Sequence, residues 1–285
     1  MPPRAIPGAA PPGPSRTILP SPVDGAHAGF VDEWRAWRAS REQQLAHPEG
    51  WLALVGLHWL APGENRIAGL PGVFALQAGR LTLTAAPEDG YTMGGGPVVE
   101  RELAQDTPGE AGHERLRLGT RTAAVIRRGE RLALRVWDAA SAARVEFRGV
   151  PSFPPDLRWR LQARWEAYSS PRRAELPRAE GPHMEGEAPG LARFDVGDRQ
   201  LSLEPVLECG QLLFAFKDAT APTETYGGGR YLDAAMPEAG RVILDFNRAY
   251  NPPCAFTPYA TCPLPAGRNV LPVRVDAGEL RFQPP

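Results

Sequence analysis

The side chains with the most specific chemistry are gathered in one segment of the chain, between Phe214 and Leu271. Arginine has almost replaced lysine, as expected of a chain encoded by GC-rich DNA, and the same bias thins out asparagine and tyrosine where they are dispensable. The segment nevertheless holds the only lysine, three of the four asparagines, four of the six tyrosines and two of the three cysteines. We therefore expect a functional site here. A structural region rich in tyrosines and turns is the alternative.

Several side chains in and near this segment are suited to binding an anion. Successive glycines before Arg230 let backbone N–H groups converge on a carboxylate or phosphate, to which the guanidinium adds a bidentate contact. The spacing is neither a P-loop nor a dinucleotide fingerprint, so a flexible turn is the other interpretation. The predicted ligand-binding residues are Arg131, Arg135, Thr220, Thr225, Tyr226, Arg230, Asn247, Arg248, Tyr250 and Asn251.

The candidate catalytic residues are Asp218, Glu224, Asp245, Cys254 and His58. The three acids have the chemistry for general acid–base work, or they neutralise the nearby arginines. Asp245 alternatively pairs with Arg248 or caps the following turn. If the protein is an enzyme, hydrolysis is the favoured class, because the sequence contains no redox or nucleotide fingerprint.

A nucleophilic role for Cys254 requires a general base and a lowered thiol pKa. His58 is the only histidine in an apolar, ordered-looking segment, and a histidine satisfied by a backbone carbonyl is the simpler interpretation. Cys254 and Cys262 alternatively pair with each other or serve as small buried hydrophobic residues, which is the default expectation.

Composition excludes several classes of protein. The formal net charge of −1 gives no reason to expect binding to nucleic acid or to an anionic membrane. The sequence has no CxxC, HExxH or His-x-His motif, so we expect no metal and no cofactor. No apolar stretch approaches the ~20 residues of a membrane span. An odd cysteine count without a secretory signal argues against a disulfide framework, and we expect a cytoplasmic protein.

The elements that would position these residues are mostly strands. An amphipathic helix is expected over residues 29–46, followed by an apolar run, Trp51–Leu60, that forms a buried helical turn or strand. From Val73 onward the hydrophobic period is two, with hairpins at Ala78-Gly79 and around Gly129. Many prolines and glycines, and no alternating βα units, predict an antiparallel β-sandwich or partly open barrel with one N-terminal helix.

We expect one β-rich domain over residues 29–285, preceded by a disordered tail rich in proline, alanine and glycine over residues 1–28. Residues 170–190 are dense in proline, glycine and charge, with almost no core candidates. This stretch is predicted to be a long surface loop, and a linker between two domains is the alternative.

These motifs closely resemble a family known as domain of unknown function 1684. The matching segments are Trp51–Leu60, Gly63–Asn65, Arg128–Arg131, Arg135, Asp138, Asp218, Thr220, Glu224–Arg230, Asp245–Phe256, Thr261–Pro265, Asn269 and Ala277–Glu279. The resemblance covers nearly the whole chain after residue 29, except residues 170–190. It implies family membership and brings no established activity with it.

Three hypotheses follow. In the first, the protein binds a small, anionic molecule in a pocket where the C-terminal motifs meet Trp51–Leu60, with or without hydrolysis. In the second, the same Arg, Asp and Tyr residues form a buried network in a non-catalytic structural or interaction module. A thiol enzyme or redox sensor based on Cys254 is a third. Replacing Arg230 or Asn247 by alanine should abolish binding under the first hypothesis and melt the protein under the second.

Overall fold

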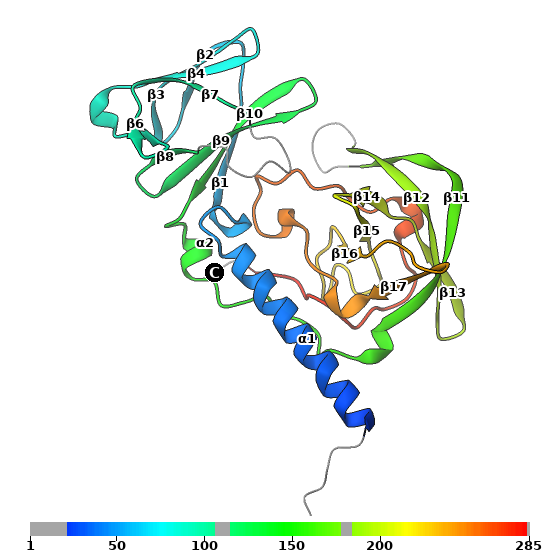
Figure 1. Ribbon diagram of the computed structural model, residues 1–285. Helices are drawn as coiled ribbons and strands as arrows, with labels where there is room; N and C mark the ends of the chain where they lie inside the picture. Colours follow the sequence, from blue (N-terminus) through cyan, green and yellow to red (C-terminus); the bar gives the residue numbers. More distant parts are fainter. Residues whose placement is uncertain (1–21, 106–114, 178–183, 284–285) are drawn as a thin grey trace, which may run out of the picture.

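The computed structural model describes residues 22–105, 115–177 and 184–283. Its strands form open antiparallel sheets in two lobes, with one long helix, α1 (Pro22–Leu45), lying along them (Figure 1). The prediction of a mainly β protein with one N-terminal helix is confirmed, and no sheet among the described strands closes into a barrel.

Helix α1 begins earlier than expected. The sequence pattern placed its start at Gly29 and assigned residues 1–28 to a tail, whereas residues 22–28 are helical. Proline is well tolerated in the first turn, where its missing N–H would be unpaired anyway, and residues 22–28 contain no large apolar side chain apart from Val23 that would reveal a helical period. Residues 1–21 lie outside the described part of the chain. Phe30, Trp34 and Leu45 are buried, so α1 is anchored along one face.

The N-terminal lobe contains two sheets. The first has the order β1-β10-β9-β8-β5-β6 and the second the order β2-β3-β4-β7. The strands are β1 (Leu54–Trp59), β2 (Gly63–Ile67), β3 (Leu70–Gln77), β4 (Arg80–Thr84), β5 (Thr92–Met93), β6 (Gly96–Pro97), β7 (Glu100–Leu103), β8 (Leu116–Leu118), β9 (Arg121–Arg128) and β10 (Arg131–Asp138). Both predicted hairpins are present, because Gln77 pairs with Arg80 and Arg128 with Arg131. Phe74, Leu83 and Leu134 are fully buried in the core of this lobe.

The C-terminal lobe also contains two sheets, ordered β13-β12-β11-β17 and β14-β15-β16. The strands are β11 (Arg160–Leu176), β12 (Met184–Val196), β13 (Arg199–Leu203), β14 (Val206–Glu208), β15 (Gln211–Phe216), β16 (Arg230–Ala234) and β17 (Arg241–Asp245). Side chains from both sheets, such as Phe194 and Phe214, share one core. Phe246 lies within it and packs edge-on against Trp159 and Phe216.

The prediction of a surface loop over residues 170–190 is wrong for those of its residues that the structure describes, because they belong to two strands. β11 and β12 form a long hairpin, in which Arg172 pairs with Ala188 and Leu176 with Met184 (Figure 1). Backbone hydrogen bonds hold this pair together, and the mostly exposed strand has few apolar side chains to mark it. Residues 178–183 lie outside the described part of the chain.

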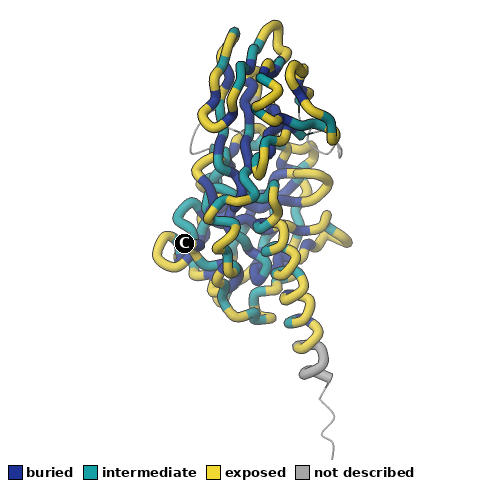
Figure 2. The backbone as a smooth tube through the Cα atoms, turned by 90° about the vertical axis from the view of Figure 1, so that its left-hand side faces the viewer, coloured by how far each residue is buried: buried dark blue, intermediate teal, exposed yellow. Residues whose placement is uncertain are grey.

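The two lobes meet at a small apolar cluster. Leu45, Leu52, Val150, Phe256 and Phe282 pack together there, close to the short helix α2 (Ala142–Val145). Buried backbone segments therefore continue from one lobe to the other (Figure 2). The expectation of a single domain stays a prediction.

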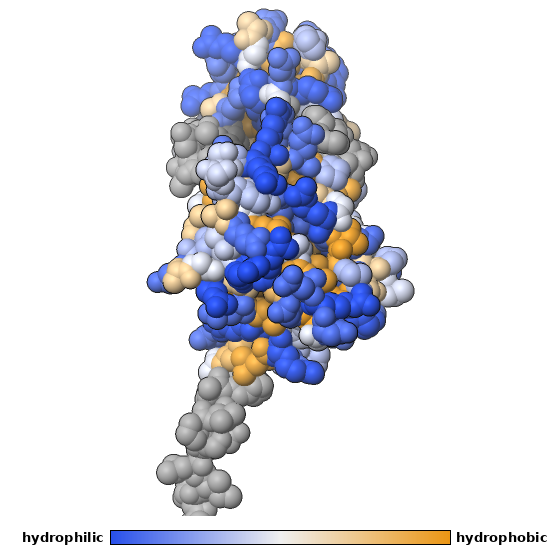
Figure 3. Space-filling view, turned by 90° about the vertical axis from the view of Figure 1, so that its right-hand side faces the viewer, coloured by the Kyte–Doolittle hydropathy of each residue, from blue (hydrophilic) through white to orange (hydrophobic). Residues whose placement is uncertain are grey.

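The face shown in Figure 3 is mainly hydrophilic, and apolar side chains form smaller patches between the hydrophilic ones. No helix in the described residues is both long and apolar enough to cross a membrane.

Candidate functional site

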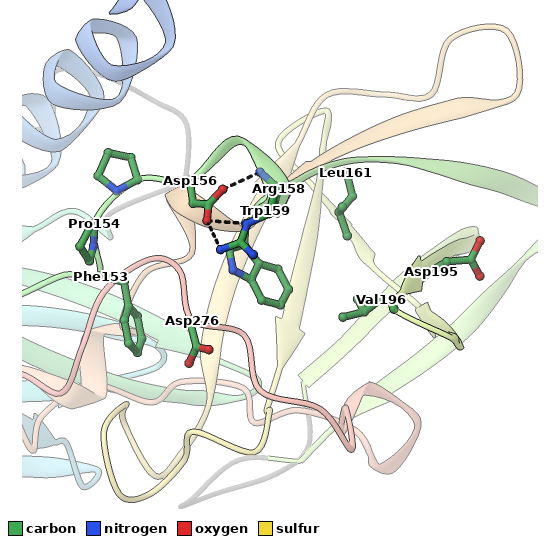
Figure 4. Close-up of a pocket in the computed structure, with 11 residues that line it drawn as sticks. Phe153, Pro154, Asp156, Arg158, Trp159, Leu161, Asp195, Val196 and Asp276 are labelled. Carbon is green, nitrogen blue, oxygen red and sulfur yellow. Dashed lines mark hydrogen bonds and ion pairs between the residues drawn. The ribbon is translucent and has the colours of Figure 1, made fainter. Parts of the chain in front are cut away.

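One cavity, in the C-terminal lobe, has a volume of about 580 Å³. We call it the Asp156 cavity. Its walls come from the segment before β11, the turn between β12 and β13, and the C-terminal segment around Asp276 (Figure 4). The lining includes Phe153, Asp156, Trp159, Asp195, Val196 and Asp276.

The acids of the Asp156 cavity are largely paired with nearby arginines. Asp156 contacts Arg158 at 2.6 Å, and Asp276 contacts Arg274 at 2.8 Å. The predicted ligand-binding residues do not line this cavity. Two of them, Asn247 and Arg230, instead hold its walls from inside the protein.

Asn247 fixes one wall of the Asp156 cavity from inside the protein. Its side-chain oxygen accepts from the Asp156 N–H at 2.8 Å, while its amide donates to the Asp156 carbonyl at 3.0 Å and to Asp245 at 2.9 Å. The backbone carbonyl of Asn247 also accepts from the Trp34 indole at 3.0 Å. Asp245 therefore orients Asn247, which ties helix α1 and β17 to the segment before β11.

Arg230 fixes the opposite segment. Only 1% of this residue is exposed, and its guanidinium donates to Asp218 at 3.1 Å, to the Val275 carbonyl at 3.1 Å and to the Ala277 carbonyl. Burial lowers the pKa of Arg230, and the carboxylate of Asp218 acts against that shift. The guanidinium is thus enclosed by protein and holds the chain on both sides of Asp276.

Thr220 and Thr225 complete the same buried network. The Thr220 hydroxyl lies 2.9 Å from Asp218 and 2.9 Å from the Thr225 hydroxyl, and Asp218 also accepts from the Val275 N–H at 2.9 Å. Both threonines are fully buried. Asp218 is therefore enclosed together with Arg230.

A smaller cavity, of about 280 Å³, is lined directly by the C-terminal motif residues. We call it the Tyr250 cavity. Tyr250, Pro253 and the stretch from Ala260 to Pro263 form one side. The remaining walls come from Arg41 of α1, Trp51 of the 3-10 helix η1 (Trp51–Ala53), Glu208, Leu213 and Tyr231. Trp51 thus meets the C-terminal motifs at a cavity, at the place proposed from sequence.

Arg41 is the basic side chain of the Tyr250 cavity. Its Nε contacts Glu279 at 3.3 Å, its Nη2 donates to the Asn251 carbonyl at 2.9 Å, and the guanidinium lies 4.6 Å from the centre of the Tyr250 ring. Nη1 makes no hydrogen bond to the described residues. Arg41 is therefore held in place by two of its nitrogens, with the third left for another acceptor.

Two carboxyl groups lie behind this arginine. Burial raises the pKa of Glu279, whose second oxygen accepts from the Asn251 N–H at 2.6 Å. Burial also raises the pKa of Asp233, which accepts from the Tyr250 hydroxyl at 3.0 Å. Asn251 donates its side-chain amide to the Leu280 carbonyl at 2.7 Å, so it supports the cavity wall and does not face the opening.

The predicted arginines lie on different elements in the two lobes. Arg131 lies in the N-terminal lobe over Trp59, at 4.3 Å from the ring centre. Arg135, on the same strand, lies over Trp51 and Trp137. Arg248 is half-buried beside Asp245 and Glu33, at 3.6 and 3.7 Å. The alternation in the sequence placed Arg131 and Arg135 on one face of their strand. It could not give the distance from these two arginines to Arg230 in the other lobe.

Two further predicted site residues, Glu224 and Tyr226, have different partners. Glu224 is engaged by Arg274 at 2.7 Å, and this hydrogen bond lowers the pKa of its carboxyl group. Tyr226 donates to the Cys254 carbonyl at 3.3 Å. Among the described residues, no group of three or more His, Cys, Asp or Glu side chains is arranged to hold a metal ion.

His58 is not placed to act as a base for Cys254. Thr257, close to Cys254 in the chain, donates to the Leu54 carbonyl at the start of β1. His58 lies four residues further along that strand, about 13 Å away at ~3.3 Å per residue, and pairs with Leu134. No hydrogen bond joins His58 to Cys254 in the described part of the chain.

Sequence reasoning missed several residues of the Tyr250 cavity, among them Arg41, Glu208 and Tyr231. One signal was available for Arg41, because it lies on the same helical face as Trp34 and Leu45, at spacings of seven and four. A charged residue on a buried helical face indicates a specific partner, here Glu279.

The fold and the site therefore define a protein of open antiparallel sheets with an enclosed polar network and two cavities. Residues 145–280 match the family described as a protein of unknown function (DUF1684), and the chain belongs to that family. The matched region does not include Trp51–Asn65 or Arg128–Asp138, which the sequence resemblance had also drawn on.

Among solved structures, the chain is similar to the solution NMR structure of an uncharacterized protein of Haloarcula marismortui. The two are 30% identical, and the alignment covers 48% of this chain and 78% of that one, with a TM-score of 0.41. No curated protein matches the chain.

Proposed function

We propose that this protein binds a small molecule in the Tyr250 cavity and that the ligand presents an anionic group to Arg41. The observation that carries the proposal is the convergence of Trp51, Arg41 and the Tyr250–Pro263 segment on one cavity. Segments far apart in the sequence meet there, and binding sites commonly form where apolar walls surround a few fixed polar groups.

The cavity walls suggest the class of ligand. A volume of about 280 Å³ is at the low end of the usual range for ligand cavities, roughly 300–1,000 Å³, so the ligand is a small metabolite and not a nucleotide. The rings of Trp51, Tyr231 and Tyr250 offer flat apolar contact, and Nη1 of Arg41 offers a charge-assisted hydrogen bond. A small planar carboxylate has both features.

The second candidate, a structural module, is supported by the buried network. Asp218, Thr220, Thr225, Arg230, Asn247 and Asn251 are all buried and hydrogen-bonded to protein. We assign these residues to holding the cavity walls. The two hypotheses are then compatible, because the buried residues have the structural role and the cavity-lining residues bind the ligand. Hydrolysis receives no support from this arrangement, because Asp218 and Asp245 are engaged by Arg230 and Asn247.

The first experiment compares native with denaturing mass spectrometry of freshly purified protein. A discrete extra mass that is lost on denaturation would identify a bound ligand. For a bare protein, benzoate is a suitable probe, because its ring and carboxylate match the cavity walls, and benzamide is its uncharged control. Benzoate should raise the melting temperature more than benzamide does, since only benzoate carries the charge that Arg41 receives.

A substitution that fills the cavity should abolish this binding. Ala260 lies in the cavity wall and is partly exposed, so Ala260→Phe adds bulk without removing a hydrogen bond. We expect benzoate affinity to fall by at least ~10-fold, measured by calorimetry, because the new ring occupies the ligand's volume. Ala140→Phe, at an exposed turn away from the cavity, is the matched control. Unchanged binding in Ala260→Phe would rule out the Tyr250 cavity as the site.

A further inference from the structure

We propose that Cys254 and Cys262 form a dithiol site that reduces hydroperoxides and closes into a reversible disulfide. This activity is separate from ligand binding at the Tyr250 cavity, although one of the two thiols lies in the wall of that cavity.

The two cysteines are in direct contact. Cys254 belongs to the 3-10 helix η5 (Pro253–Ala255), and its backbone N–H donates to Cys262 Sγ at 3.1 Å. The two thiol groups also shift each other's pKa values in opposite directions. Both cysteines pack in one apolar cluster with Tyr231 and Tyr250. The seven residues between them therefore return the chain so that the two cysteines are in contact in this fold.

Their exposure assigns different roles to the two thiols. Cys254 is partly exposed, whereas Cys262 is buried and lines the Tyr250 cavity. A peroxide arriving from solvent meets Cys254 first, and Cys262 lies behind it. Cys209, in an exposed turn elsewhere in the lobe, offers an internal comparison within the same protein.

The surrounding hydroxyl groups support the same assignment. The neighbouring Cys262 and, to a smaller extent, Tyr226 lower the pKa of the Cys254 thiol to about 7, against the effect of burial. The neighbouring Cys254, together with burial, raises the pKa of Cys262, while Tyr231 acts in the opposite direction. Tyr226 and Tyr231 thus flank the pair, and Arg41 and Glu208 are the charged groups of the adjoining cavity.

The chemistry is balanced with a hydroperoxide as the oxidant. The Cys254 thiolate attacks the terminal peroxide oxygen, the O–O bond breaks, and the leaving oxygen takes a proton to depart as water or an alcohol. Cys262 then attacks the resulting sulfenic acid, forming the S–S bond and releasing water. Two thiols lose two electrons in total, and a thiol reductant restores them.

The test is treatment of the reduced protein with one equivalent of hydrogen peroxide, followed by intact mass measurement and peptide mapping. We expect a loss of about 2 Da that dithiothreitol reverses, with the new bond joining Cys254 to Cys262. Cys209→Ser should behave as wild type. Cys262→Ser should stop at the sulfenic acid, which dimedone traps on Cys254. Oxidation that occurs first at Cys209, or a Cys254→Ser protein that consumes peroxide as fast as wild type, would overturn the proposal.

A second measurement needs no variant and therefore does not depend on their folding. In the wild-type protein, the pH dependence of iodoacetamide labelling at Cys254 should have its midpoint near pH 7, as the thiolate forms with rising pH. An ordinary thiol has its midpoint near pH ~8.5. A Cys254 midpoint at or above that of Cys209 would contradict the assignment. Benzoate binding is measured on the reduced protein, in which the disulfide is absent. The proposal of ligand binding and the proposal of a dithiol site can therefore fail independently of each other.

Discussion

Replacing Arg230 by alanine should destabilise the folded protein by about 3–5 kcal/mol, because it leaves the carboxylate of Asp218 buried without its partner. Asp218 and Arg230 are each only about 1% exposed at the side chain, so water cannot take over the lost contact. The substitution also leaves the carbonyls of Val275 and Ala277 without their donor. The free energy of unfolding, from urea denaturation followed by circular dichroism, measures this effect.

The matched control is Arg274→Ala. Arg274 also pairs with acids, Glu224 and Asp276, but half of its side chain is exposed, so we expect little change in stability. An Arg230→Ala protein as stable as the Arg274→Ala protein would contradict the structural role. Such a result would return Arg230 to the group of candidate ligand contacts, which was its assignment from sequence.

The second large effect is expected for Asn247→Ala, at about 2–4 kcal/mol. The substitution leaves the partly buried N–H and carbonyl of Asp156 and the buried Asp245 carboxylate without their Asn247 partner, and an unpaired buried group costs ~1–3 kcal/mol. Gln200→Ala, an exposed amide on β13, is the control and should be close to neutral. Urea denaturation again gives the free energies.

Asn247→Ala also has a local signature that distinguishes it from Arg230→Ala. Because Asn247 clamps the backbone at Asp156, we expect amide hydrogen exchange to rise first in the segment before β11. Arg230→Ala should instead release the segment around Asp276. Exchange that rises equally over the whole lobe in Asn247→Ala would indicate a global loss of packing and not the loss of this clamp.

Local patterns predicted the strands of the N-terminal lobe well. The alternation of Leu132, Leu134 and Val136 placed these side chains in the core, where each is at most 4% exposed. The hairpin at Ala78-Gly79 followed from turn chemistry, and both residues adopt positive φ. Both of these correct predictions depend only on residues that are close together in the sequence.

The failures depend on contacts between distant residues or on backbone hydrogen bonds alone. The part of the β11–β12 hairpin within residues 170–190 is dense in charged residues, proline and glycine, so it has no hydrophobic period to detect. Arg230 and Arg131 have the same side chain, yet one is enclosed in the C-terminal lobe and the other stacks on Trp59. Only the tertiary fold distinguishes these two arginines. Composition therefore singled out the segment from Phe214 to Leu271 but could not tell which of its residues bind a ligand and which support the fold.

The Tyr250 cavity is composite, because Arg41 and Trp51 precede the region matched by the family and the remaining lining residues lie within it. A family member could therefore keep the whole matched region and still change two walls of the cavity by altering its N-terminal part. In evolutionary terms, ligand preference would diverge at the N-terminal part while the buried scaffold stayed constant. Annotation transferred on the strength of the matched region alone would then carry over the fold without the specificity.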